Sequence, residues 1–462
     1  MALNYSLFAV FYKWKHLTCG EDGEHLGQSE EEQWEKPKSK LTRKHKHCTF
    51  GDKGELPLGY ICTSVVRGML HPSTGEYQFI PSVVIRYMAS LLDESIAISP
   101  TTVSVQELIK RPLDSVPKRF IRLDSTPQAG PSDLNGLPTI DMKKLLGITS
   151  DSSDESFNGE LGRLHFSCRE WGIFQLVNHG VSSSFLQQLR HEIEGFFKLP
   201  LKEKMKYKAN PGESDGYGNV VRTEKNHLDW GDRLFMTINP ISKRKPHLFP
   251  ELPPSLRSTL ETYIQELKKI AIQILKCLAI CLGIDTNLMM DLFKEEKGLE
   301  TLRATYYPPC PQPELVVGLT PHSDATAITI LHQITNCVNG LQIKRNGMWF
   351  PVDIPDDAFI VNMGDIMEII SNGAYPSIEH RAMVNTESER ISVAMFFNPR
   401  LDAQVGPAAS LVSPKSPARF RRFIMDEYVK GFFAHPMNGK SYLNGLKIMN
   451  EASDGDDLKE EA

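Results

Sequence analysis

Three residues with metal-binding side chains stand in a part of the sequence that is rich in strand-forming residues. His322 and Asp324 are two positions apart, and His380 follows much later in the chain. Residues i and i+2 of a β-strand point to the same face, so the first two side chains can reach one ion. A second strand could bring His380 beside them. Two imidazoles and one carboxylate on one side of a metal suit Fe(II) and leave its other positions open.

A second pair of residues repeats this spacing further along the chain. Arg390 and Ser392 are also two positions apart and would share a face of a later strand. A planar guanidinium beside a hydroxyl suits a carboxylate, which arginine can bind through two parallel hydrogen bonds. A 2-oxo acid could therefore chelate the metal at one end and meet Arg390 at the other.

Other residues with ligand chemistry are better explained by structural roles. His179 lies in a turn after an apolar run, and His332 ends another such run. Asp365 follows a glycine, a context that favours capping of a turn. Glu379 would point to the face opposite His380 if both lie on one strand. We therefore expect none of the four to bind the metal.

The region from residue 299 to 400 has the pattern of a β-rich catalytic domain. Short runs of β-branched and aromatic residues alternate there with Pro, Gly and Asn. Asn339-Gly340 and Asn346-Gly347 predict hairpin turns on either side of one strand. We expect a mostly β core with flanking helices, built as two facing antiparallel sheets in a double-stranded β-helix, or jelly roll.

The preceding region, residues 101–298, predicts helices mixed with edge strands. Its longest helical pattern runs from Ser255 to Leu282, with Ser255 as the expected N-cap and apolar residues three or four positions apart. Residues 401–450 predict a helical C-terminal segment, and residues 451–462 an acidic tail. Residues 1–100 mix charges with few aliphatic side chains in places, and we expect a poorly structured N-terminal extension.

Composition excludes several classes of protein. The chain has 462 residues with a formal net charge of −5, which does not fit a basic nucleic-acid-binding surface. Its apolar runs are shorter than the roughly 18 residues needed to span a bilayer. The eight cysteines form no CxxC pair, so reduced thiols are expected. We expect a cytoplasmic protein that binds neither nucleic acid nor membrane.

The ordered series of motifs resembles a known family. The segments YYPPCPQPELVVGLTPHSDATAITILH, EHRAMVN and RISVAMFFNP resemble the plant 2-oxoglutarate- and Fe(II)-dependent dioxygenases. That superfamily includes isopenicillin N synthase, and the resemblance is greatest to the branch with the codeine and thebaine O-demethylases and the senescence-related oxygenases. It extends from about Ser104 to about Asn444.

The resemblance implies a role for each matching residue. His322, Asp324 and His380 match iron ligands, and Arg390, Ser392 and Tyr307 match the residues that bind 2-oxoglutarate. Two residues before Tyr307, where many relatives carry asparagine, this chain has Thr305. Phe396 matches a position that stacks on aromatic substrates in some relatives, and core packing is an equal alternative.

The implied activity is an oxidation that consumes 2-oxoglutarate and O₂ and releases succinate and CO₂, with ascorbate as reductant. A small specialised metabolite or hormone would be hydroxylated, demethylated or desaturated by a monomeric enzyme. Three alternatives stay open: an ascorbate-dependent or ring-closing iron oxidase on the same fold, a non-catalytic binding protein, and a zinc hydrolase. Succinate release that depends on added 2-oxoglutarate would distinguish the implied activity from the ascorbate-dependent or ring-closing oxidase. Absence of bound iron after anaerobic reconstitution would support the binding protein, and oxygen consumption would exclude the zinc hydrolase.

Overall fold

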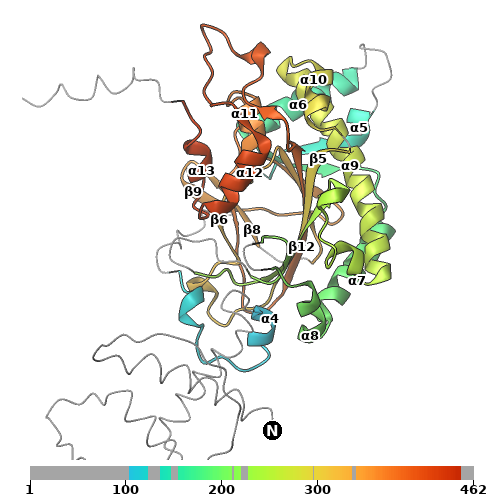
Figure 1. The fold of residues 1–462 in the computed structure, drawn as a ribbon, viewed down its shortest axis with the longest axis vertical. Coiled ribbons are helices and arrows are strands. Elements are labelled where there is room, and N and C mark those ends of the chain that lie inside the picture. Colours follow the sequence, from blue (N-terminus) through green and yellow to red (C-terminus); the bar gives the residue numbers. More distant parts are fainter. Residues whose placement is uncertain are drawn as a thin grey trace, which may run out of the picture. The chain divides into compact units, whose positions relative to one another are not determined.

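The strand-forming runs build two sheets that face each other, as expected for a jelly roll (Figure 1). The computed structural model describes residues 104–122, 136–146, 155–210, 213–219, 227–294, 296–335 and 340–448. All of these belong to one unit of the chain, Pro81–Ala462. The predicted N-terminal extension and acidic tail lie outside the described residues.

The larger sheet has eight strands in the order β1-β2-β10-β7-β12-β5-β4-β3. Its strands are β1 Thr139–Asp141, β2 Ile173–Val177, β3 Gly216–Tyr217, β4 Asp232–Asn239, β5 Gly298–Tyr307, β7 Ile328–Gln333, β10 Phe359–Met363 and β12 Arg390–Arg400. Every neighbouring pair is antiparallel except β1 and β2. Because β2 pairs with β10, strands from the predicted 101–298 and 299–400 regions share one sheet.

The smaller sheet has four strands in the order β6-β11-β8-β9. Its strands are β6 Leu319–His322, β8 Leu341–Arg345, β9 Met348–Pro351 and β11 His380–Ala382. Asn346 and Gly347 join β8 to β9 with φ values of 49° and 79°, the backbone conformation that a two-residue hairpin turn requires. The prediction of a turn there is confirmed, whereas Asn339 lies outside the described residues. A separate ribbon pairs β13 Gln404–Val405 with β14 Phe423–Ile424.

Helix α9, Pro254–Leu282, braces the larger sheet from outside and contacts β7 and β12 (Figure 1). Apolar side chains such as Leu260, Leu267 and Ile274 are buried along it, which confirms the predicted stripe. The predicted N-cap is wrong. Pro254 already occupies the first turn, where its missing N–H costs nothing, and the hydroxyl of Ser255 donates to Glu192 instead.

The remaining helices in the described part of the chain cover the sheets or connect their strands. They are α4 Val105–Leu108, α5 Met142–Leu146, α6 Glu155–Glu170, α7 Ser183–Lys198, α8 Leu201–Lys204, α10 Thr286–Leu292, α11 Asp365–Ile370, α12 Met425–Ala434 and α13 Ser441–Asn444. Short 3₁₀ helices occupy Lys118–Phe120, Met205–Tyr207, Ile241–Lys243, Phe249–Glu251, Pro313–Leu315 and Ala409–Leu411.

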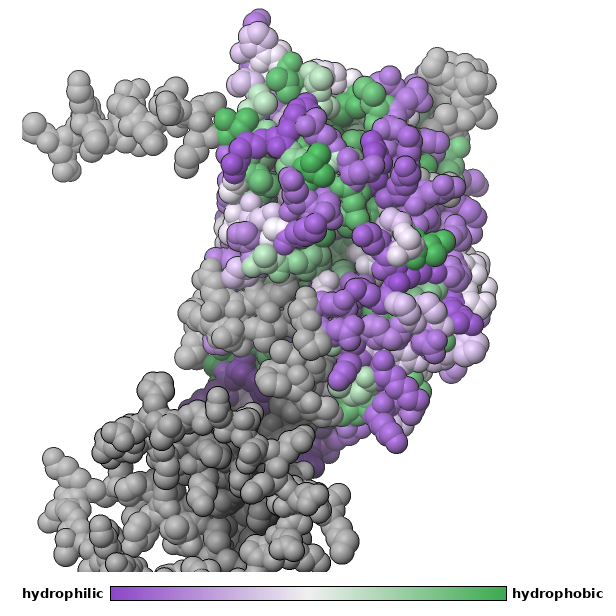
Figure 2. Space-filling view, viewed as in Figure 1, coloured by the Kyte–Doolittle hydropathy of each residue, from purple (hydrophilic) through white to green (hydrophobic). Residues whose placement is uncertain are grey.

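On the face drawn in Figure 2, hydrophilic side chains cover most of the described surface, and hydrophobic ones form small groups among them. None of the helices in the described part of the chain combines the length and apolar character that crossing a bilayer demands. Most large apolar side chains are instead buried around the two sheets.

Candidate metal centre

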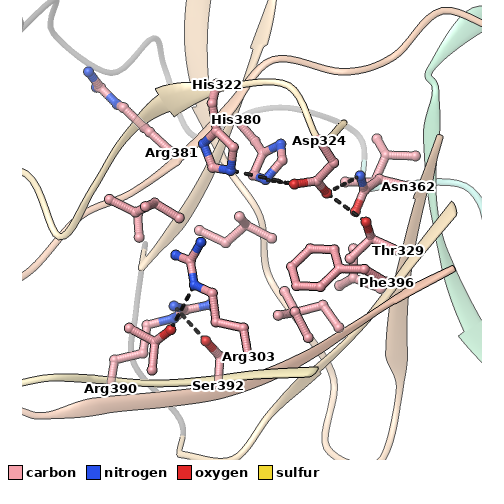
Figure 3. Close-up of a pocket in the computed structure, with 18 of the residues that line it drawn as sticks. Arg303, His322, Asp324, Thr329, Asn362, His380, Arg381, Arg390, Ser392 and Phe396 are labelled. Atoms are coloured by element: carbon pink, nitrogen blue, oxygen red, sulfur yellow. Dashed lines mark hydrogen bonds and ion pairs between the residues drawn. The ribbon is translucent and has the colours of Figure 1, made fainter. Parts of the chain in front are cut away.

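The pairing of β6 with β11 brings the two histidines of the predicted triad together. His322 and His380 stand directly opposite each other in this antiparallel pair, and their ring centroids are 4.4 Å apart. Asp324 follows just after β6 ends. Its Oδ1 lies 3.5 Å from His322 Nε2 and 3.8 Å from His380 Nε2 (Figure 3). One potential ligand atom from each residue therefore fits within 4.8 Å of the others.

Hydrogen bonds to the backbone orient both imidazoles. His322 Nδ1 lies 2.9 Å from the carbonyl oxygen of Thr320, and His380 Nδ1 lies 3.2 Å from that of Ile378. A carbonyl only accepts, so each Nδ1 carries a proton, and each Nε2 is the nitrogen that faces Asp324 and could bind a metal. Burial lowers the pKa of His380 to about 4, which keeps this imidazole neutral, as metal binding requires.

Two buried side chains fix the carboxylate of Asp324. Its Oδ2 accepts hydrogen bonds from Thr329 Oγ1 at 2.7 Å and from Asn362 Nδ2 at 2.8 Å, which leaves Oδ1 turned toward the histidines. Burial alone would raise the pKa of Asp324, but the two histidines and Asn362 outweigh it and hold the pKa well below its usual range. The carboxyl group is therefore ionised and oriented.

This donor set fits Fe(II). Two imidazoles and one carboxylate converge from one side, the arrangement typical of iron that keeps open positions. Within the described ranges, no other group of three or more His, Cys, Asp or Glu side chains converges in this way. The donor types and their orientation thus match the metal that the sequence predicted.

The residues that we expected not to bind metal have other partners. His179 hydrogen-bonds the carbonyl of Asp357, and Glu379 pairs with Lys344 at 3.2 Å. His332 is buried against Phe359 and Tyr263. Asp365 differs from expectation, because it does not cap a turn. It is buried at the start of α11 and accepts a hydrogen bond from Ser377 Oγ at 2.6 Å.

The predicted carboxylate anchor lies on the inner face of the larger sheet. Arg390 stands opposite Tyr307 of β5, and its guanidinium carbon is 5.2 Å from the centroid of that ring. Its Nε donates to Gln333 Oε1 at 3.0 Å, and Nη1 donates to Ser392 Oγ at 3.4 Å. Arg390 is only 2% exposed. A buried guanidinium held in this way presents a fixed positive charge inside the protein.

One cavity between the two sheets holds all the predicted site residues, and we call it the anchor cleft. Its empty volume is about 570 Å³, including its opening to solvent. The predicted residues on its wall are His322, Asp324, His380, Tyr307, Arg390, Ser392 and Phe396. The structure therefore brings together side chains that are spread over more than eighty positions of the sequence.

A second cavity, the aromatic cleft, opens from the same centre. Its empty volume is about 670 Å³, and Phe235, Phe396 and two phenylalanines of α12, Phe432 and Phe433, line it. His322, Asp324, Arg303 and Phe396 border both clefts. Phe396 thus faces a cavity, whereas its contact with a substrate stays a prediction.

Sequence reasoning missed Arg303, Thr329, Asn362 and Gln333. Arg303 is four residues before Tyr307 on β5, so strand alternation could have placed it on the inner face. Asn362 is a polar residue inside the fully buried strand β10, which is itself a signal of a hydrogen-bonding role. The partners of Thr329 and Gln333 depend on strand register, which the sequence alone did not reveal.

Comparisons with known proteins agree with this geometry. Residues 299–399 match the 2OG-Fe(II) oxygenase superfamily, and residues 137–255 match the N-terminal region of non-haem dioxygenases in morphine synthesis. The chain is 45% identical over 348 residues to oxoglutarate-dependent flavonoid 7-O-demethylase 1 of Ocimum basilicum, which covers 75% of this chain and 91% of that protein. It is 43% identical over 353 residues to codeine O-demethylase of Papaver somniferum, covering 75% of this chain and 96% of that protein.

Similarity extends to Protein SRG1 of Arabidopsis thaliana, with 46% identity over 350 residues that cover 75% of this chain and 96% of that protein. The crystal structure of JOX2 in complex with 2OG, Fe and JA superposes with a TM-score of 0.68 at 34% identity, covering 75% of this chain and 98% of that one. This chain therefore belongs to the 2-oxoglutarate- and Fe(II)-dependent oxygenase superfamily, in the branch that contains SRG1 and the codeine and thebaine O-demethylases.

Proposed function

We propose that this Fe(II)- and 2-oxoglutarate-dependent dioxygenase holds its iron with His322, Asp324 and His380 and removes a methyl group from a small aromatic metabolite. The observation that carries the ligand assignment is the convergence of the three donors within 4.8 Å, with Nε2 of both histidines and Oδ1 of Asp324 facing one another. Iron at this site supplies the redox chemistry that couples decarboxylation of 2-oxoglutarate to oxidation of a substrate C–H bond.

Arg390 binds the distal carboxylate of 2-oxoglutarate in this proposal. Its buried guanidinium can form two parallel hydrogen bonds with a carboxylate, and Ser392 Oγ beside it can donate another. Tyr307 borders the same cleft. Gln333 holds Arg390 from the side through Nε, so the anchor is preorganised before the cosubstrate arrives.

The substrate occupies the aromatic cleft. Phenylalanine side chains on β4, β12 and α12 offer ring faces and edges to a flat aromatic molecule. The relatives named for O-demethylation of a flavonoid and of codeine support a methyl ether as the group attacked. Hydroxylation of a methyl carbon yields a hemiacetal, which releases formaldehyde and leaves a free hydroxyl.

We also propose that the protein works as a monomer in the cytoplasm, with ascorbate keeping the iron reduced. The free cysteines among the described residues support a reducing compartment. Light scattering of the purified protein tests the monomer, and imaging of a fluorescent fusion tests the compartment.

The test is a coupled assay on iron-reconstituted enzyme. A panel of methylated flavonoids and alkaloids is incubated with 2-oxoglutarate, O₂ and ascorbate, and succinate and formaldehyde are both measured. We expect equal amounts of the two products with the true substrate. Succinate without formaldehyde from every methyl ether that is oxidised would refute demethylation. Turnover that persists with ascorbate but without 2-oxoglutarate would instead favour the ascorbate-dependent or ring-closing oxidase.

A further inference from the structure

We propose that Arg303, with Arg233 beside it, binds a carboxylate of the substrate, so that the enzyme acts on an aromatic acid. This inference rests on the proposed function, because it names the class of molecule that enters the aromatic cleft. Both arginines border that cleft, together with the phenylalanines described above.

Strand register places the two arginines next to each other on the inner face of the larger sheet. Arg233 of β4 stands opposite Thr305 of β5, and Phe235 stands opposite Arg303. Directly opposite residues share a face, and so do residues two apart on one strand. Arg233 and Arg303 are therefore diagonal neighbours, and such pairs have typical separations of about 7–8 Å. Arg233 donates from Nη2 to the carbonyl oxygen of Ser214 at 3.1 Å, so its contribution beside Arg303 is mainly positive charge.

Arg303 keeps most of its hydrogen-bonding capacity for a ligand. Its Nε donates to Thr305 Oγ1 at 3.1 Å, and this is its one hydrogen bond within the described part of the chain, where it forms no ion pair. In Figure 3 its guanidinium points away from the Arg390–Ser392 pair and toward the two histidines. The two terminal nitrogens, Nη1 and Nη2, can thus donate together to one carboxylate near the metal centre.

The charge of the whole site favours an anionic substrate. Among the described residues that line the two clefts, Arg233, Arg303 and Arg390 stand against the single carboxylate of Asp324. Arg381 is left out of this count, because its guanidinium lies over Trp349 and points away from the metal centre (Figure 3). Fe(II) and the 2-oxoglutarate dianion cancel each other, so loading both still leaves the site cationic. A cleft of one sign with low-dielectric walls concentrates ligands of the opposite sign.

The aromatic part of the ligand follows from the neighbours of Arg303. Phe235, which stands opposite it, lies 6.4 Å from Phe396 and 6.3 Å from Phe433 between ring centroids. On the other side, Arg303 faces Ala394 of β12, whose small side chain leaves room beside the guanidinium. Arg233 is fixed over the ring of Phe235, with its guanidinium carbon 5.4 Å from the ring centroid. A ring packed on these phenylalanines would direct its carboxylate to the arginines.

A carboxylate at Arg303 could also come from 2-oxoglutarate, whose second carboxylate chelates the metal. The experiment separates these two sources. Calorimetric titration under anaerobic conditions measures the Kd of 2-oxoglutarate for the Fe(II) enzyme. It then measures the Kd of several aromatic acids, including cinnamate and 1-naphthaleneacetate, and of their methyl esters for the Fe(II)·2-oxoglutarate enzyme. The variants are Arg303→Gln, Arg303→Lys and the control Arg400→Gln, which removes one charge beside Asp402, at the far end of β12.

We expect at least one acid to bind the wild-type enzyme more tightly than its ester. Arg303→Gln should weaken that acid about 10- to 100-fold, the usual effect of losing a hydrogen bond to a charged group, and should leave its ester nearly unchanged. Arg303→Lys should recover part of the loss, and Arg400→Gln should match wild type.

Two results overturn the proposal. One is that none of the acids binds more tightly than its ester. The other is that Arg303→Gln weakens 2-oxoglutarate as much as it weakens the acid, which would assign Arg303 to the cosubstrate. Failure of the proposed function looks different, because it would appear in the coupled assay as succinate without formaldehyde and would leave the preference for an acid over its ester, and the effect of Arg303→Gln on it, unchanged.

Discussion

The amide of Asn362 offers the sharpest test of how the protein prepares its metal site. Together with Thr329 it holds Oδ2 of Asp324, so that Oδ1 faces His322 and His380. Replacing Asn362 with Ala deletes one of these two hydrogen bonds and leaves all three proposed metal ligands in place. The carboxylate can then rotate, and its pKa rises because a donor that lowers it is lost.

The size of the effect follows from the kind of bond removed. A hydrogen bond to a charged group contributes about 1.5–3 kcal/mol, which corresponds to about 10- to 150-fold in an equilibrium constant. Loss of a partner that orients a metal ligand usually weakens metal binding by about 10- to 100-fold. We therefore expect Asn362→Ala to raise the Kd for Fe(II) by about 10- to 100-fold.

Anaerobic competition between the protein and a chromophoric chelator measures that Kd. The matched control is Asn287→Ala, because Asn287 is exposed on α10, outside both clefts. Thr329→Val removes the other donor with little change of shape, and the double variant should show coupling because both residues act on one oxygen. A Kd within twofold of wild type for Asn362→Ala would refute the view that this hydrogen bond orients Asp324.

Three further predictions concern the anchor, the pH dependence of stability and the C-terminal segment. Arg390→Leu should raise the 2-oxoglutarate requirement by at least about 30-fold in steady-state assays, since it removes a buried partner of a carboxylate, while iron content stays the same; an unchanged requirement would remove Arg390 from the anchor. Burial lowers the pKa of His332 to about 4 in the folded protein, whereas the same side chain has a pKa of about 6.5 in the unfolded chain. The unfolded chain therefore binds a proton first as the pH drops, and the free energy of unfolding falls between pH 7 and pH 5. In chemical denaturation of metal-free protein, the free energy of unfolding of His332→Gln should fall by about 2 kcal/mol less than that of wild type over this pH range. An equal fall in both proteins would contradict this role of His332. Lys440→Met should destabilise the fold by about 2 kcal/mol, because the buried Glu368 loses the lysine that lies 2.6 Å from its carboxylate. Adding Glu368→Gln to the same chain should recover part of that loss. An unchanged denaturation midpoint for Lys440→Met would show that the ion pair contributes nothing to stability.

Local spacing was enough to select two of the three proposed ligands and the proposed anchor. His322 and Asp324, like Arg390 and Ser392, are separated by the two positions that place side chains on one side of an extended backbone. The turn at Asn346-Gly347 was predictable for a similar reason, since few residues adopt positive φ at both positions. The resemblance to the plant dioxygenases then supplied the partner histidine, which no local rule could have selected.

Contacts between distant strands were beyond the reach of the sequence. Asn362 reaches Asp324 because β10 pairs with β7, and Arg303 reaches the cavity because β5 lies between β4 and β12. Helix α12 brings Phe432 and Phe433 to the cleft from a segment that follows both sheets. Strand order and register decide each of these contacts, and a one-residue slip would turn the side chains to the other face.

The most direct test of the central claim is the stoichiometry of Fe(II) binding in three proteins: wild type, Asp324→Ala and Glu379→Ala. The control removes a carboxylate next to His380 that pairs with Lys344 and does not face the donors. Anaerobic titration should give one equivalent of tightly bound Fe(II) for wild type and Glu379→Ala, and none for Asp324→Ala. One tightly bound equivalent in Asp324→Ala would contradict the assignment of His322, Asp324 and His380 as the iron site.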